Sequence, residues 1–216
     1  MWVVKLGGSL LGAPALLHWL ETLIKISDGK VLIVPGGGVF ADAVRQAQQR
    51  SHVDDAVAHT LALMAMDQFG LLLAGMHPQL TTASSELEIA ERGWQHRAIV
   101  WLPSKMVLAD ESVPKNWQIT SDSLSAWLAN KISAEQLILV KSKSLTLYQN
   151  TLSVHLDELI QNGLVDSGFG LYYDGKSYHA NILHKNNYAV LADGLELQTL
   201  KENSVFINTD VVLNVR

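Results

Sequence analysis

The first ten residues place several phosphate-binding groups side by side. Residues 3–6 form a short, mostly apolar run that contains Lys5 and leads into Gly7, Gly8 and Ser9. Glycines let backbone N–H groups approach an anion closely. Lys5 adds a full positive charge, and a serine hydroxyl at a helix start adds another donor. We therefore expect this strand and loop to hold phosphate.

A second glycine loop follows the next expected strand, residues 30–34. Gly36, Gly37 and Gly38 come directly after Pro35. Either loop alone could be a tight turn before a helix. Two such loops, each after a strand and each opening a helix, favour two phosphate sites, one for a donor and one for an acceptor. Neither loop has the spacing of a Walker A or dinucleotide-binding motif.

Hydroxyl and carboxyl groups gather again before a helix in the middle of the chain. Thr120 and Ser121 supply hydroxyls, and Asp122 stands at the expected helix start. A simple alternative is a helix cap, in which Asp122 or Ser121 satisfies the first backbone N–H groups.

Charged residues also follow the glycine triplet. Asp42 and Arg45 lie one helical turn apart, so Arg45 could bind a substrate phosphate through two parallel hydrogen bonds and Asp42 could bind an ammonium group. A surface ion pair is an equal alternative. His59 and Asp67 share a face of the next helix, and a satisfied core histidine is the simpler interpretation of His59.

Composition excludes several classes of protein. The 216 residues carry a formal net charge of −5, with Lys and Arg scattered, which argues against binding to nucleic acid. There is no cysteine, so disulfides and thiolate chemistry are excluded. The chain begins on an expected strand and not on a signal peptide. The apolar stretch 56–75 contains His59, Asp67 and Gln68, so we interpret it as a core helix and not as a membrane span. We expect a cytoplasmic protein that spans no membrane.

Apolar periodicity predicts alternating strands and helices. We expect strands at 3–6, 30–34, 98–102, 136–140, 145–148, 188–192 and 211–215. We expect helices at 15–26, 38–49, 54–75, 84–92, 122–130 and 157–162, with a polar connection at 103–119. Such alternation is typical of an α/β fold, a three-layer α/β/α sandwich with a mostly parallel sheet. In these sheets ligands bind at the carboxyl ends of the strands, where both glycine loops fall.

The order of the three motifs resembles the amino acid kinase superfamily. K-L-G-G-S near the N-terminus, V-P-G-G-G after the second strand and T-S-D-S before a mid-chain helix carry the resemblance. P-G-G-G-V-F-A-D, A-H and A-M-D-Q-F-G, at residues 35–42, 58–59 and 65–70, are similar to the members that phosphorylate an aminomethylfuran-methyl phosphate in methanofuran biosynthesis.

The resemblance implies a single domain, 1–216, with an acceptor-binding lobe at 1–133 and a nucleotide-binding lobe at 134–216. It implies an ATP- and Mg²⁺-dependent kinase whose metal arrives with ATP, with no metal site built by the protein. Catalytic roles fall on Lys5 and Asp122. Nucleotide binding falls on Gly7, Gly8, Ser9, Lys141 and Lys143. Acceptor binding falls on Gly36, Gly37, Gly38, Asp42, Arg45, Thr120 and Ser121.

The expected acceptor is an aminomethylfuran-methyl phosphate, and the expected assembly is a homo-oligomer. Several nucleotide-side features of the superfamily differ here: Lys141-Ser142-Lys143 stands where many members carry an Asp-Gly pair, and Asn208-Thr209-Asp210 replaces a Gly-Thr element. Two alternatives therefore stay open. One is a uridylate kinase or another kinase of the superfamily, and the other is a non-catalytic relative that binds a nucleotide or metabolite.

Overall fold

One eight-stranded sheet organises the part of the chain that the structure describes. A computed structural model describes residues 1–148, 151 and 153–209. The strand order is β3-β4-β2-β1-β5-β7-β8-β6, and every pair is parallel except β7 with β8. The strands are β1 Trp2–Leu6, β2 Val31–Pro35, β3 Leu80–Ala83, β4 Ala98–Trp101, β5 Gln136–Lys141, β6 Ser153–His155, β7 His179–His184 and β8 Val205–Asn208.

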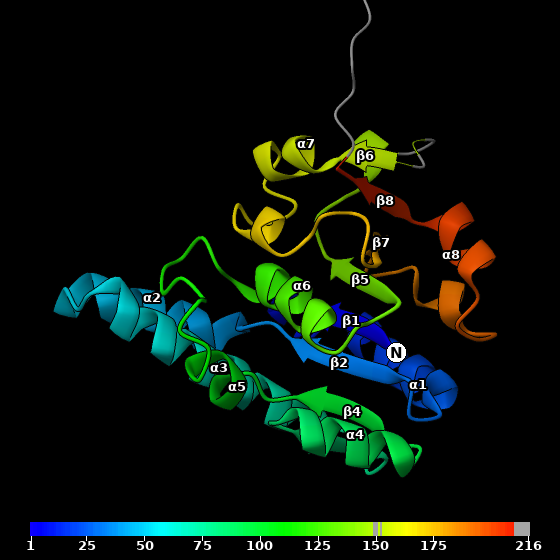
Figure 1. Ribbon diagram of the computed structural model, residues 1–216, viewed down its shortest axis with the longest axis horizontal. Coiled ribbons are helices and arrows are strands. Elements are labelled where there is room, and N and C mark those ends of the chain that lie inside the picture. Colours follow the sequence, from blue (N-terminus) through cyan, green and yellow to red (C-terminus); the bar gives the residue numbers. More distant parts are fainter. Residues whose placement is uncertain (149–150, 152, 210–216) are drawn as a thin grey trace, which may run out of the picture.

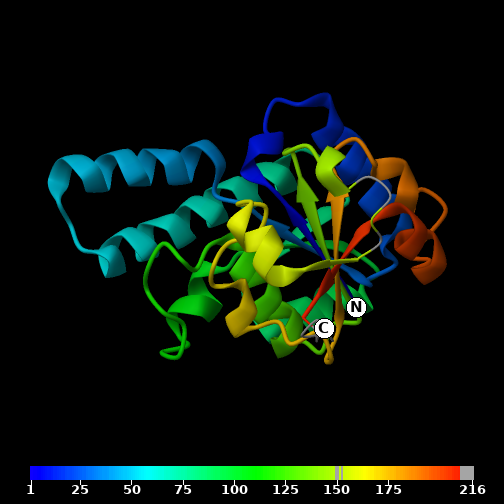
Figure 2. The same cartoon turned by 90° about the horizontal axis from the view of Figure 1, so that it is seen from above.

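Helices cover both faces of this sheet (Figure 1), which confirms the expected α/β sandwich. They are α1 Pro14–Ser27, α2 Gly38–Ser51, α3 Asp55–Gly75, α4 Glu86–Trp94, α5 Ser104–Leu108, α6 Ser121–Lys131, α7 Leu156–Gln161 and α8 Leu197–Asn203. Helices α2 and α3 form a hairpin that projects from the body of the molecule (Figure 2).

Strand pleating separates the buried residues into two cores. Alternate residues of a strand point to opposite faces. On β1, Trp2, Val4 and Leu6 pack with α1 in one core, whereas Val3 packs with α6 in the other. Lys5 follows the alternation of Val3, so its side chain is directed to the α6 face. This parity places a charged residue of a buried strand beside the start of α6.

Some expected elements were wrong. Residues 146–148 and 188–191 are 3₁₀ turns and not strands, and the connection 103–119 contains α5. The structure instead places strands β3, β6, β7 and β8 where none was expected. These strands are short or mix polar with apolar residues, so their pairing partners decide their conformation more than their own pattern does. The strand expected at 211–215 lies outside the described residues.

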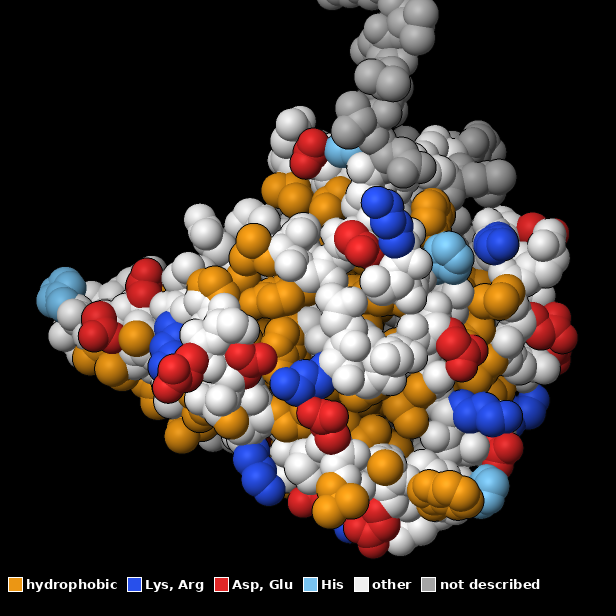
Figure 3. All heavy atoms as spheres, viewed as in Figure 1, with side chains coloured by type: hydrophobic (Ala, Val, Ile, Leu, Met, Phe, Trp, Pro, Cys, Tyr) orange, Lys and Arg blue, Asp and Glu red, His pale blue; other side chains and the backbone are white. Residues whose placement is uncertain are grey.

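Helix α3 is apolar on almost all sides. By length and composition it is the one described helix that could cross a membrane, although 44% of its most apolar window is buried within the fold. Figure 3 shows apolar side chains along the lower margin of the projecting hairpin. Val57, Leu61, Met64 and Leu71 are exposed members of α3.

Candidate active site

The two glycine loops lie in backbone contact at the carboxyl edge of the sheet. A Cβ atom on Gly8 would lie 2.1 Å from both Cα and N of Gly38. A Cβ atom on Gly36 would lie 2.5 Å from the Gly8 nitrogen. Gly38 has a φ of +54°, in the left-handed region that favours glycine. Because β1 and β2 are adjacent and parallel, the loops that follow them meet at this edge.

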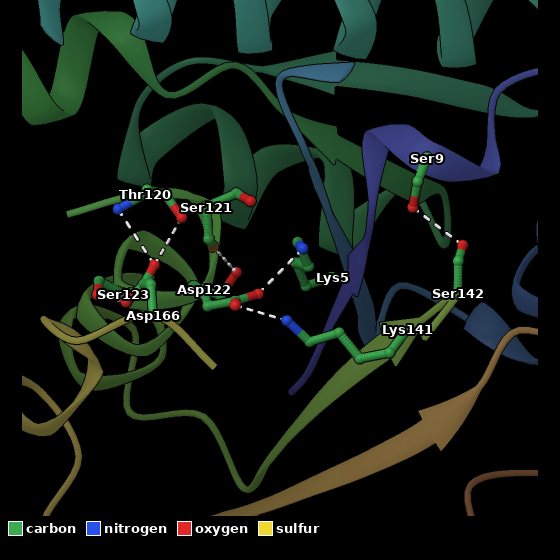
Figure 4. A network of polar contacts seen from close by, with 10 residues as sticks. Lys5, Ser9, Thr120, Ser121, Asp122, Ser123, Lys141, Ser142 and Asp166 are labelled. Atoms are coloured by element: carbon green, nitrogen blue, oxygen red, sulfur yellow. Dashed lines mark hydrogen bonds and ion pairs between the residues drawn. The ribbon is translucent and has the colours of Figure 1, made fainter. Parts of the chain in front are cut away.

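Between these loops and α6, two lysines share one carboxylate (Figure 4). Lys5 Nζ lies 3.0 Å from Asp122 Oδ1, and Lys141 Nζ lies 2.5 Å from Asp122 Oδ2. The side chains of the three residues are 8 to 12% exposed. Register explains the meeting: Lys5 pairs with Leu139 of β5, so Lys141, two residues on, points to the same face.

The charges of this cluster depend on one another. Burial alone would raise the pKa of Asp122, but the Lys141 and Lys5 ammonium groups hold it well below its usual range. Burial lowers the pKa of Lys141; the Asp122 carboxylate opposes this shift and the Lys5 ammonium adds to it. With both lysines protonated, the cluster carries one excess positive charge, which suits a site for phosphoryl oxygens.

A second carboxylate, Asp166, fixes the start of α6. Its oxygens accept hydrogen bonds from Thr120 N at 3.1 Å, Thr120 Oγ1 at 2.6 Å and Ser123 N at 3.1 Å, and also from Ser123 Oγ. Burial and the nearby Asp122 raise the pKa of Asp166, whereas the Ser123 and Thr120 donors lower it. Asp166 therefore caps the helix, and neither Ser121 nor Asp122 does.

Sequence reasoning missed Asp166 because it lies in a loop far along the chain. The sequence carries no signal for Asp166, because only the structure shows that Asp122 turns to the lysines and that another carboxylate caps α6. Gly168 lets this loop approach, since a Cβ there would lie 2.7 Å from the Gln118 carbonyl oxygen.

A pocket of about 180 Å³ opens beside the glycine triplet. Its polar lining includes all seven residues expected to bind the acceptor, together with Gly8: Gly36, Gly37, Gly38, Asp42, Arg45, Thr120 and Ser121. Its apolar lining comes from Ala41, Ala62, Leu63, Met66, Ile119 and Leu124. We call this the acceptor pocket.

The mouth of the acceptor pocket is held by contacts between α2 and the loop before α6. Arg45 donates to Asp42 Oδ1 at 2.9 Å, and its guanidinium lies 4.6 Å from the Trp117 ring centre. Trp117 Nε1 donates to Gln48 Oε1 at 2.7 Å. Asp42 and Arg45 thus form the surface ion pair considered above, and they also line the pocket.

The residues expected to bind the nucleotide do not all lie together. Ser9 Oγ and Ser142 Oγ lie 2.9 Å apart, which joins the first glycine loop to the end of β5. A hollow at the carboxyl ends of β5 and β7 is lined by polar residues including Thr146, Asn187 and Ser204. Lys143 does not join the Lys5–Asp122–Lys141 cluster, because its ammonium donates to the Asn162 carbonyl oxygen.

Comparison with known proteins agrees with this geometry. The model of the amino acid kinase family matches residues 1–144. The [5-(aminomethyl)furan-3-yl]methyl phosphate kinase of Methanocaldococcus jannaschii is 32% identical over 145 residues, a match that spans 64% of this chain and 64% of that relative.

Three solved structures of uridylate (UMP) kinases share the fold. The Archaeoglobus fulgidus enzyme has a TM-score of 0.68 and 16% identity over 96% of this chain and 99% of its own. The Ureaplasma parvum enzyme has a TM-score of 0.70 and 14% identity over 96% of this chain and 98% of its own. The Bacillus anthracis enzyme has a TM-score of 0.70 and 14% identity over 97% of this chain and 96% of its own. With the family match across residues 1–144, the chain belongs to the amino acid kinase family.

Proposed function

We propose that this chain is an ATP- and Mg²⁺-dependent kinase that transfers a phosphoryl group to a small, phosphate-bearing acceptor. The observation that carries the proposal is the Lys5–Asp122–Lys141 cluster, which lies beside two abutting glycine loops. Phosphoryl transfer needs positioning and charge neutralisation more than covalent chemistry from the protein. Two buried ammonium groups held by one carboxylate provide both.

Each residue of the cluster has a distinct role in this proposal. Lys5 and Lys141 neutralise negative charge on the transferring phosphoryl oxygens. Asp122 orients both ammonium groups and opposes the lowering of the Lys141 pKa by burial. Backbone N–H groups of Gly7 and Gly8 face the donor phosphates, and those of the triplet 36–38 face the acceptor.

The donor set on the nucleotide side fits a triphosphate. ATP supplies the phosphoryl group, the Ser9 hydroxyl lies at the first glycine loop, and the polar hollow beside Thr146 can take the rest of the nucleotide. Within the described residues, no group of three or more His, Asp or Glu side chains is arranged to hold a metal ion. We therefore propose that Mg²⁺ is held mainly by the phosphates of ATP.

The acceptor we propose is an aminomethylfuran-methyl phosphate, the substrate named for the M. jannaschii relative. The triplet N–H groups and Arg45 can bind its phosphate, with the Thr120 and Ser121 hydroxyls nearby. Asp42, which is paired with Arg45, lies in the same lining. The apolar wall of the acceptor pocket suits a small ring. A homo-oligomer and a cytoplasmic location remain predictions; sedimentation velocity and fractionation measure them.

A coupled assay of ADP release tests the proposal. ATP–Mg²⁺ is supplied with the furan phosphate, UMP, isopentenyl phosphate, aspartate or acetylglutamate. Turnover of the furan phosphate alone supports the proposed acceptor, and turnover of UMP alone identifies a uridylate kinase instead. Silence across the panel, with no rise of Tm on addition of ATP–Mg²⁺, identifies a non-catalytic relative.

A pair of lysine variants tests the site itself. Lys5→Met keeps the aliphatic stem and removes the charge, so turnover should fall by about 10²- to 10³-fold, the usual effect of removing one preorganised transition-state donor. Lys25→Met is the matched control, because Lys25 is exposed on α1 and, among the described residues, donates to the Ala192 carbonyl oxygen alone. Equal turnover by a folded Lys5→Met protein would rule out the role of Lys5.

A further inference from the structure

One residue in the wall of the acceptor pocket has a polar atom with no partner among the described residues. His59 lies on α3 and is 4% exposed, and it lines the pocket beside Ala62, Leu63 and Met66. Its Nε2 atom is buried and has no hydrogen-bond partner among the described residues. Buried polar groups are nearly always paired, so this atom marks a position where a ligand can form a bond that the protein does not.

The surroundings of His59 favour the neutral form of its ring. Burial lowers its pKa, the Lys115 ammonium adds to this effect, and a hydrogen bond with the Asn116 backbone opposes it. In a neutral imidazole one ring nitrogen carries the proton and the other carries a lone pair that can accept a hydrogen bond.

We infer that His59 is a specificity-determining residue, whose Nε2 accepts a hydrogen bond from an N–H or O–H group of the acceptor. The inference rests on the proposed kinase function. It assigns the acceptor a donor group on the part that lies against α3, away from the phosphate held by the glycine triplet. The aminomethyl group of the furan phosphate is such a donor.

His59 is better suited to this role than Asp42, the carboxylate in the lining of the same pocket. The Asp42 carboxylate is 64% exposed and already paired with Arg45 at 2.9 Å. A ligand bond there replaces water and competes with an existing ion pair. A bond to His59 satisfies a buried atom that is otherwise unpaired, so it discriminates more strongly between ligands with and without the donor.

Two acceptors that differ by one donor test the inference. The aminomethylfuran-methyl phosphate is compared with its analogue that carries a methyl group in place of the aminomethyl group. We expect wild type to prefer the amine by at least tenfold in kcat/KM, mostly through KM. His59→Leu should abolish the preference, His59→Gln should restore part of it because its carbonyl oxygen can accept, and His18→Leu on α1 should leave it unchanged.

If folded His59→Leu keeps the preference for the amine, the inference is overturned. It is also overturned if Asp42→Asn loses this preference while His59→Leu does not. If wild type turns over neither furan, the proposed substrate fails, and binding then decides the inference by itself. Wild type is titrated with 3-aminopropyl phosphate and propyl phosphate while the ¹⁵N shift of His59 Nε2 is followed by NMR. Tighter binding of the amine with a shift of Nε2 supports the inference, and equal binding or an unmoved Nε2 overturns it.

Discussion

Gly8 and Gly38 are in direct backbone contact, so close that a methyl group on Gly8 would lie 2.1 Å from the Gly38 Cα atom. One glycine ends the loop after β1, and the other opens helix α2 after β2. The contact fixes the separation between the proposed donor and acceptor loops. A kinase needs its two phosphate groups held in line at a short distance, and here the backbone itself sets that distance.

The first prediction concerns this contact. Gly8→Ala should lower the free energy of unfolding by about 1–3 kcal/mol, the usual cost of overpacking, and should reduce turnover because the loops must move apart. Gly7→Ala is the control: Gly7 has a φ of −62°, and its Cβ would meet only ordinary contacts at 3.4 Å or more. Urea unfolding compares the two, and equal stability of both variants would contradict the prediction.

Removal of the shared carboxylate should leave two buried ammonium groups facing each other. We expect Asp122→Asn to lower the free energy of unfolding at pH 7 by about 3–5 kcal/mol, as when one partner of a buried ion pair is removed. In this variant Lys141 loses the carboxylate that opposes the effect of burial, so its folded pKa falls further below that of the unfolded chain. The unfolded state then binds more protons, and stability rises with pH. The deficit relative to wild type should therefore shrink between pH 7 and pH 10. A deficit that stays constant would contradict this account.

The alkaline limit of activity should report Lys141. Burial lowers its pKa below the ordinary 10.5 of lysine, although Asp122 opposes the shift. Activity that needs the protonated ammonium should thus fall on an alkaline limb below pH 10.5. Lys141→Arg keeps the positive charge on a guanidinium that stays protonated at far higher pH. The alkaline limb of activity should therefore move to higher pH, even if the maximal turnover of the variant is lower. An unmoved limb would assign it to another group.

Asp166 should act through position and not through contact with substrate. Asp166→Asn replaces an acceptor of four hydrogen bonds by an amide, which leaves donors at the start of α6 unpaired. We expect a loss of about 1–3 kcal/mol in the free energy of unfolding and a higher KM for the acceptor, since Thr120 and Ser121 lose their support. Asp193→Asn, at an exposed position, is the control. An unchanged KM in a destabilised variant would limit Asp166 to a structural role.

The sequence was sufficient for the features that depend on local chemistry. Apolar strands that end in glycine predict phosphate loops because backbone freedom is a property of the residue itself. Alternation of strands and helices predicts the parallel sheet, and parallel strands place both loops at one edge. Lys5 and Asp122 could be named because K-L-G-G-S and T-S-D-S resemble motifs of the amino acid kinase superfamily, and the structure brings their charged groups to 3.0 Å.

The tertiary structure decided which distant residues complete the site. Both Lys141 and Lys143 follow β5, and only the pairing of β5 with β1 shows that Lys141 faces Asp122 while Lys143 turns to the Asn162 carbonyl. Asp166 caps α6 from a loop that no local pattern connects with it. His59 is typical of a core histidine in the sequence, and only the fold shows its unpaired Nε2 in the wall of a pocket. Chemistry that arises from residue type is local and can be read along the chain, whereas strand register, helix capping from afar and the partners of a buried atom depend on contacts that exist only after folding.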